Sequence, residues 1–224
     1  MPLAPPDTVY DPPRDPYVSI VYRDDDILVL DKPSGLLSVP ALDPALYDSL
    51  LVRVRETYPA AHVINRLDKD TSGLVLMGLN SKAHSVIGQQ LEKRTARKSY
   101  VAVVAGHMAG DEGLIDLPLG SDSDNKPRHR VDHANGKPSQ TRWRVIARLD
   151  APVPATRLQL EPLTGRTHQL RVHLKAIGHT ILGDALYATP ELRFAAPRLM
   201  LHNEMFGFVH PNGQEMTFTS PCPF

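Results

Sequence analysis

The chain has 224 residues, of which 42% are hydrophobic and 22% charged, and its 25 basic side chains balance its 25 acidic ones. This composition can supply the core of one large domain or of two closely packed subdomains, so we expect a soluble globular protein. No apolar run reaches the roughly 18 residues of a membrane span, and the start of the chain lacks the basic and apolar regions of a signal peptide. We therefore expect neither export nor membrane contact, and Cys222, the only cysteine, fits a reducing cytoplasm.

The chain divides into an arm and a folded region. Residues 1–16 contain six prolines and little apolar material, so we expect an extended arm ahead of one domain at 17–224. In chain order we predict strands at 17–22 and 26–32, a helix at 48–58, strands at 62–68 and 73–79, a helix at 81–94, strands at 98–107, 139–149 and 156–163, and a helix at 167–178.

Local signals support the ends of two of these helices. Ser81 is a plausible N-cap of the helix at 81–94, and Gly178 a plausible C-cap of the helix at 167–178. Strands and helices are mixed without a regular βαβ repeat. This order favours an α+β fold with a largely antiparallel sheet.

The segment NRLDKDTSGLVLMG, at 65–78, places an arginine and two acids directly before an apolar run. If 62–68 is a strand, Arg66 and Asp68 point to the same face, and the guanidinium can lie near the carboxylate where the strand ends. The alternative is that Asp68 and Asp70 are turn residues and Arg66 is a surface partner. From this segment alone both interpretations stay open.

A third interpretation comes from the D-x-D-x-T spacing in DKDTS, which is typical of phosphohydrolases of the haloacid dehalogenase type. Asp184, after Gly183, could then imitate the metal-binding motif of that class. Against this, Asn65 and Arg66 occupy positions where that fold buries apolar side chains, and Asp184 has no second acid beside it to hold magnesium.

RLD at 66–68 followed by TSGL at 71–74 resembles the R-L-D-x-x-T-S-G-L signature of pseudouridine synthases of the RluA family. Further segments resemble that family in order and spacing: DDDILVLDKPSGLLSVP, ARKSYVAVVAGH, LTGRTHQLRVHLKAIGHTILGDALY and PRLMLHNEMFGF. The resemblance covers about residues 17–224 and is greatest to short members without an N-terminal S4 RNA-binding domain, especially the dual-specificity enzyme for tRNA and large-subunit rRNA. One departure is Asn65, where many relatives have His, and this could alter how Arg66 is held.

The resemblance implies the pseudouridine synthase catalytic fold, with a central mixed, largely antiparallel sheet flanked by helices. It implies an isomerase that breaks the N1–C1′ bond of uridine and joins C5 to C1′, without a cofactor. Asp68 matches the family's catalytic aspartate, as covalent nucleophile or as electrostatic stabiliser of the sugar. Arg171 matches the arginine paired with it, and Tyr100 the tyrosine that packs on the base and is a candidate for proton transfer.

Structured RNA is the expected partner, although the net charge is zero and runs of charge are usually solvated faces. By resemblance, Arg66 enters the RNA where the flipped uridine was. The other expected RNA-binding residues are Lys93, Arg94, Arg97, Lys98, Lys126, Arg128, Arg130 and Arg166. We expect a monomer acting on stem-loops of tRNA and 23S rRNA, with a uridine of the anticodon loop as one target.

The sequence argues against two other classes of function. The ten histidines invite a metal site, but His168 and His173 are five apart, off one helical face, and no Cys or acid completes a cluster. We therefore expect structural histidines and no metal. An RNA-binding module that has lost activity should lack Asp68 or Tyr100, and both are present.

Overall fold

The computed structural model describes residues 10–151 and 153–224. The first nine residues of the predicted arm lie outside the described residues. Its last seven contain no helix or strand and lie against the domain, where the Tyr10 hydroxyl donates a hydrogen bond to the Asp48 carbonyl (2.9 Å). In the described part of the chain no helix is long and apolar enough to cross a bilayer.

Sixteen strands and helices form the fold, with two short 3₁₀ helices at Pro44–Leu46 and Ser123–Asn125. In chain order they are β1 (Ile20–Arg23), β2 (Ile27–Lys32), α1 (Leu50–Arg55), β3 (His62–Val63), β4 (Ser72–Gly78), α2 (Ser81–Glu92), β5 (Arg97–Ala105), β6 (Glu112–Asp116), β7 (Leu119–Ser121), β8 (His129–Val131), β9 (Gln140–Leu149), β10 (Ala155–Pro162), α3 (Gln169–Ala176), α4 (Pro190–Phe194), β11 (Leu201–Val209) and β12 (Glu215–Thr219).

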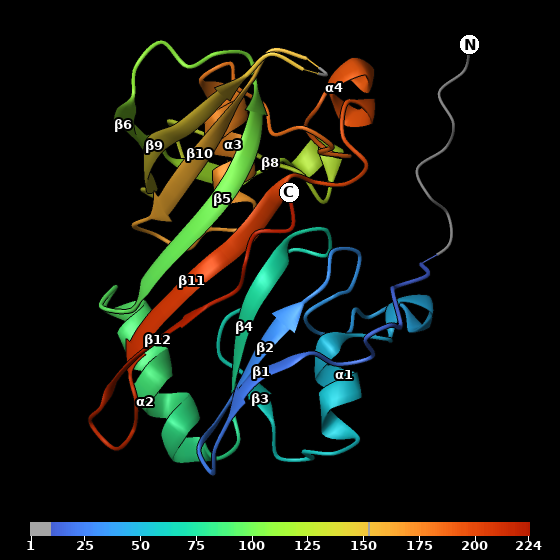
Figure 1. Cartoon of the computed structure of the whole chain (residues 1–224), viewed down its shortest axis with the longest axis vertical. Coiled ribbons are helices and arrows are strands. Elements are labelled where there is room, and N and C mark those ends of the chain that lie inside the picture. Colours follow the sequence, from blue (N-terminus) through green and yellow to red (C-terminus); the bar gives the residue numbers. More distant parts are fainter. Residues whose placement is uncertain (1–9, 152) are drawn as a thin grey trace.

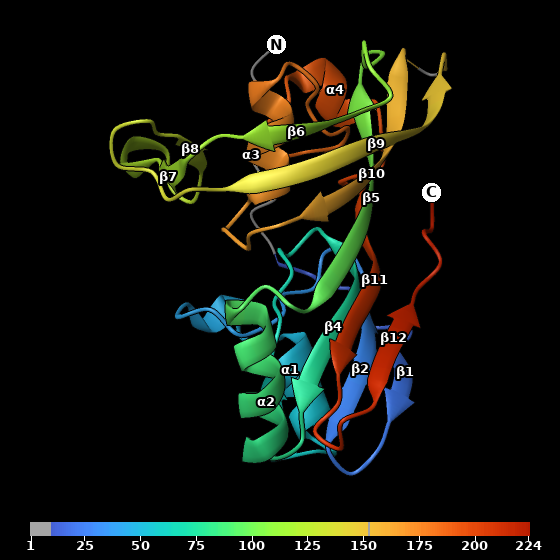
Figure 2. The same cartoon turned by 90° about the vertical axis from the view of Figure 1, so that its left-hand side faces the viewer.

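Ten of the strands form one sheet, in the order β1-β2-β4-β11-β5-β10-β9-β6, with β12 beside β11 and β3 beside β4. Only β4 and β11 pair in parallel, and every other pair is antiparallel. Figures 1 and 2 show the long strands β5 and β11 joining a half that holds β1, β2, β4, α1 and α2 to a half that holds β6, β9, β10, α3 and α4. The predicted α+β fold with a mixed, largely antiparallel sheet is confirmed.

The parallel contact between β4 and β11 depends on a glycine. Gly73 has a φ of +108°, and a Cβ built on it would lie 2.3 Å from the carbonyl oxygen of Asn203 on β11. No other residue type combines this φ with so close an approach of two backbones. The TSGL motif therefore contains the residue that lets the two halves of the sheet meet.

Side chains alternate along the central strands and bury both faces of the sheet. One core packs α1 and α3 against the sheet, and includes Leu30, Leu50, Met77 and Leu174. The second packs Ala83 and Ile87 of α2 against the opposite sides of β2, β4 and β11. The site-bearing segments therefore rest on a sheet that is covered on both faces.

The predicted strand at 62–68 is wrong beyond Val63, because only β3 pairs with β4 there. The Asn65 side chain replaces the next ladder bonds: its Oδ1 accepts from the Leu76 N–H (2.7 Å) and its Nδ2 donates to the Leu74 carbonyl (3.2 Å). The chain then leaves the sheet, so residues 66–68 form a loop and the argument from a shared strand face fails.

The predicted helix ends need one correction. Asn80, not Ser81, is the N-cap of α2, and its side chain accepts a hydrogen bond from the Ala83 N–H (2.9 Å). Gly178 lies one residue beyond the C-cap Ile177 of α3, with a φ of +86°. This is the left-handed position in which glycine commonly ends a helix.

Candidate active site

A cleft of about 1050 Å³ lies where the two halves of the molecule meet. One wall is formed by residues 37–39 and the loop that carries Asp68, and the other by residues 161–171. Tyr100 and Leu201, from the two strands that join the halves, also line it. The cleft brings together Asp68, Tyr100 and Arg171, the three residues predicted from the sequence to be catalytic.

Buried contacts hold the loop that carries Asp68. The ammonium of Lys32, which is fully buried, donates to the carbonyls of Pro33 (2.8 Å), Leu36 (2.6 Å) and Lys69 (2.8 Å). Burial lowers the pKa of Lys32 to about 7, although the charges of Asp70 and Asp68 act in the opposite direction. The backbone that follows Asp68 is therefore tied to the end of β2.

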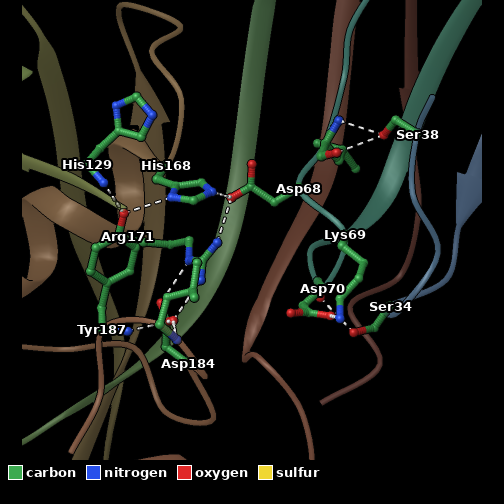
Figure 3. Close-up of polar contacts among 12 residues, drawn as sticks. Ser34, Ser38, Asp68, Lys69, Asp70, His129, His168, Arg171, Asp184 and Tyr187 are labelled. Carbon is green, nitrogen blue, oxygen red and sulfur yellow. Dashed lines mark hydrogen bonds and ion pairs between the residues drawn. The ribbon is translucent and has the colours of Figure 1, made fainter. Parts of the chain in front are cut away.

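Two serines add further bonds to this loop, as Figure 3 shows. Ser38 Oγ accepts from the Leu67 N–H (3.0 Å) and donates to the Leu67 carbonyl (2.8 Å). Ser34 Oγ donates to the Asp70 carbonyl (2.6 Å). The residues on both sides of Asp68 are fixed, which positions its carboxylate at the edge of the cleft.

Arg171 on α3 reaches across the cleft, and its Nη1 donates to Asp68 Oδ2 at 3.0 Å. The rest of the guanidinium is held by Asp184, which accepts from Nε (2.8 Å) and from Nη2 (2.7 Å). Burial alone would lower the pKa of Arg171, but the hydrogen bonds and charges of Asp184 and Asp68 outweigh it and raise that pKa. Arg171 is 3% exposed, so it is a permanently charged, buried cation and not a helix-surface one.

Asp184 is fully engaged and cannot serve as a metal ligand without losing these contacts. Its Oδ1 also accepts from the N–H groups of Leu186 (2.9 Å) and Tyr187 (3.1 Å), and the residue is 1% exposed. No cluster of three or more His, Cys, Asp or Glu side chains with metal-ligand geometry occurs within 10–151 and 153–224. The phosphohydrolase interpretation is therefore not supported.

Tyr100 on β5 is 9% exposed and faces the cleft. Burial and then the charge of Asp68 raise its pKa, so the phenol keeps its proton at neutral pH. Lys98 lies two residues earlier on the same face of the strand and also lines the cleft. Burial lowers the pKa of Lys98, and no hydrogen bond or ion pair from the described residues reaches its ammonium.

The remaining predicted RNA-binding residues fall into two groups. Arg66, Arg94, Arg97 and Arg166 line the cleft together with Lys98. The others are exposed and do not line it in the described structure: Lys93 at the end of α2, and Lys126, Arg128 and Arg130 around β8. The first basic run therefore borders the candidate site, and the second lies on a separate edge of the same half as α3.

Sequence reasoning missed two residues of the site. His168, expected to be structural, has its Nε2 3.8 Å from Asp68 Oδ2, and its Nδ1 lies 2.7 Å from the Tyr187 hydroxyl. Tyr187 also packs its ring over the Arg171 guanidinium, 5.1 Å from centroid to Cζ. Both residues lie in the motif segment LTGRTHQLRVHLKAIGHTILGDALY, and this was the one sequence signal that could have indicated a place in the site. His173 is fully buried and bonds Thr141 and the Leu117 carbonyl, which is a structural environment.

Comparisons with known proteins agree with this geometry. The family model of RNA pseudouridylate synthases matches residues 26–176. The chain is 46% identical over 216 residues to the dual-specificity RNA pseudouridine synthase RluA of Escherichia coli K12, covering 96% of this chain and 98% of that protein. It is 43% identical, with the same coverage, to the protein of the same name in Haemophilus influenzae.

Solved structures show the same similarity. Human RNA pseudouridylate synthase domain containing 1 superposes with a TM-score of 0.81 at 30% identity, over 96% of this chain and 87% of that one. Human RNA pseudouridylate synthase domain containing 4 superposes with a TM-score of 0.70 at 21% identity, over 92% and 88% of the two chains, and shares the fold.

Proposed function

The chain belongs to the RNA pseudouridylate synthase family, and we propose that Asp68 is the carboxylate with which it isomerises uridines in RNA to pseudouridine. The observation that carries this assignment is the contact between Asp68 and the buried Arg171 in the cleft. Arg171 places a buried positive charge 3.0 Å from this carboxylate, at the point where the two walls of the cleft meet.

The reaction places limited demands on the protein. The N1–C1′ bond of uridine breaks, the uracil turns, C5 bonds to C1′, and the proton lost from C5 is balanced by one gained at N1. Asp68 acts on the ribose or the uracil as nucleophile, or stabilises the sugar cation by its charge. Tyr100, buried and protonated, packs against the base. The isomerisation takes neither electrons nor a transferred group from a cofactor.

The substrate that these residues suit is an RNA loop from which one base can be flipped out. Arg66 is exposed at the cleft edge, and the neighbouring Asn65 is tied to β4 by two hydrogen bonds, which fixes the backbone that presents Arg66. We assign Arg66 to the gap that the flipped uridine leaves in the stack. Asn65 performs this anchoring in this chain.

The targets we propose are a uridine in the tRNA anticodon stem-loop and one in a 23S rRNA stem-loop, because the similar bacterial proteins are named dual-specificity enzymes. The basic residues that border the cleft, Arg94, Arg97, Lys98 and Arg166, would contact phosphates next to the flipped base. Lys93 and the run at 126–130 would contact more distant phosphates. We propose that the protein acts on these RNAs as a monomer in the cytoplasm.

The test replaces Asp68 with Asn, which keeps the shape of the side chain and removes its charge. We expect pseudouridine formation to be lost while RNA affinity changes little, because phosphate contacts supply most of that affinity. Asp70→Asn is the matched control, since Asp70 is two residues away and pairs only with Lys69 at 3.6 Å in the described structure. Mass spectrometry of carbodiimide-labelled RNA measures the product, and wild-type turnover in Asp68→Asn would remove Asp68 from the chemistry.

The substrate proposal has a separate test. Purified protein is incubated with an isolated anticodon stem-loop and with a 23S rRNA stem-loop, and each is expected to gain one pseudouridine in its loop. Modification of intact ribosomal RNA at another site, with neither stem-loop modified, would contradict the targets and leave the chemistry in place.

A further inference from the structure

His168 is held in an unusual backbone conformation at the edge of the cleft. Its φ is +55°, in the left-handed region that non-glycine residues rarely occupy, and it is the N-cap of α3 without using its side chain to cap the helix. Such strain persists where the surrounding structure enforces it, and it is concentrated at functional sites. The imidazole is thereby directed away from the helix end and toward Asp68, as Figure 3 shows.

The hydrogen bonds around Tyr187 favour one tautomer of His168. The Tyr187 hydroxyl oxygen accepts the backbone N–H of His129 at 2.7 Å and lies 2.7 Å from His168 Nδ1. An N–H can only donate, so the hydroxyl oxygen already acts as an acceptor toward His129, and we infer that its single proton is donated to Nδ1, the acceptor that lies beside it in the described residues. His168 Nδ1 is then the acceptor, and the ring proton is on Nε2.

The Nε2 proton faces the same carboxylate oxygen that Arg171 binds. Nε2 lies 3.8 Å from Asp68 Oδ2, and Arg171 Nη1 lies 3.0 Å from that oxygen. A separation of 3.8 Å is too long for a hydrogen bond, but a shift of about 1 Å closes it, and contacts of this kind commonly shorten when substrate binds. No hydrogen bond from residues 10–151 or 153–224 reaches Asp68 Oδ1, which Figure 3 shows pointing away from both donors.

We propose that His168 is a positioning residue that, together with Arg171, holds Asp68 through Oδ2, so that Oδ1 is the atom that reacts with the uridine. This inference rests on the proposed role of Asp68. It adds a second donor to the site and identifies which oxygen is free to attack or to face the sugar. Tyr187 acts through His168, because its hydroxyl keeps the ring proton on the nitrogen that faces Asp68.

Burial of His168 favours a neutral ring at pH 7. Burial lowers its pKa, and the charges of Arg171 and His129 act in the same direction, while Asp68 and Asp184 oppose them. A neutral N–H orients the carboxylate without adding a second full positive charge to it. Asp68 therefore keeps more of its reactivity than it would beside an imidazolium.

The experiment compares His168→Asn and His168→Gln with wild type. Asn tolerates the left-handed conformation but is too short to reach Asp68, whereas Gln can place an amide N–H near the position of Nε2. We expect the single-turnover rate to fall roughly 10- to 100-fold for Asn and less for Gln, with hairpin RNA affinity unchanged. A rate for Asn within about twofold of wild type, or equal losses for both variants, would overturn the positioning role.

Two further tests address the tautomer of His168 and the role of Tyr187. Nitrogen-15 NMR of the wild-type imidazole is expected to show the neutral tautomer with its proton on Nε2, and a proton on Nδ1 would overturn the proposal. Tyr187→Phe keeps the ring over Arg171 and removes only the hydroxyl, so it should raise the pKa of His168 and move the acid limb of the rate profile to higher pH. Combined with His168→Asn it should add no further loss, and additive losses would contradict a role through His168.

The control for the underlying function is Asp68→Asn in the same assay. If wild type forms pseudouridine and Asp68→Asn does not, the proposed function stands whatever His168 does. If Asp68→Asn keeps wild-type activity, the role of Asp68 fails first, and the assignment of Oδ1 fails with it.

Discussion

Asp184→Asn is expected to destabilise the protein by about 3 kcal/mol, the lower end of the range for breaking a buried ion pair. In the native site Oδ1 accepts from Arg171 Nη2 and from two backbone N–H groups, and Oδ2 accepts from Arg171 Nε. The Asn oxygen can keep the three bonds at Oδ1. Its amide nitrogen then faces the Arg171 Nε–H, so two donors oppose each other while the buried guanidinium loses its closer counter-charge.

Urea denaturation followed by circular dichroism measures this loss, provided that the dependence on urea keeps the same slope. Asp111→Asn is the matched control, because Asp111 pairs with Arg148 at 2.8 Å but its side chain is 84% exposed. Such a pair contributes less than about 1 kcal/mol. A loss for Asp184→Asn within about 0.5 kcal/mol of the control would refute the claim that the buried pair anchors Arg171.

The folded chain releases the Lys32 proton near pH 7, whereas the unfolded chain keeps it until about pH 10. The free energy of unfolding of wild type, relative to that of Lys32→Met, should therefore rise with pH above 7. Thermal unfolding of both proteins between about pH 6 and 9 tests this, and parallel plots of stability against pH would contradict it. Lys98→Met should weaken hairpin binding and lower the log–log salt slope by roughly 0.7 to 0.9. Lys93→Met, outside the cleft, should do less, and equal effects of the two variants would exclude a special role for the half-buried Lys98 ammonium in the cleft. Gly73→Ala should reduce the yield of folded protein because its Cβ would meet Asn203 at 2.3 Å, whereas Gly88→Ala, with open space around its Cβ, should be tolerated in the same solubility and melting assay. Turnover should persist in excess EDTA; a loss restored by magnesium, with the RNA shown to be folded, would revive a metal-dependent reaction.

The strands that were predicted correctly are those that a local residue pattern indicates without knowledge of the neighbouring strand. The buried run at 73–78 and the alternating pattern of β9 are local signals, and both strands form close to their expected limits. β11 was not predicted, because LHNEMFGFV contains the buried polar residues His202 and Asn203. Their hydrogen bonds go to Ser72, to the Ser220 carbonyl and to the Leu74 carbonyl, and the bonds to β4 span about 130 residues that no sequence window covers.

Prediction of the site from sequence is limited in the same way, because its residues contact partners that are distant in the chain. Motif resemblance was enough to select Asp68 and Arg171, which the structure places 3.0 Å apart although they are 103 residues apart in the chain. The strand predicted for 62–68 failed because Asn65 takes over the ladder bonds through its side chain, which its residue type alone did not reveal. His168 was judged by helical spacing to its neighbour His173, while its actual partner Tyr187 lies beyond the end of α3.

The place of β11 in the sheet has a consequence for the order in which the protein can be made. This strand is synthesised after ten of the other strands, yet it lies at the centre, between β4 and β5. Until residues 201–209 have left the ribosome, the two halves have no shared strand between β4 and β5, and the inner edges of both stay unpaired. Asp68 and Arg171 are on opposite sides of that seam, so we expect the contact between them to form only after β11 has been translated.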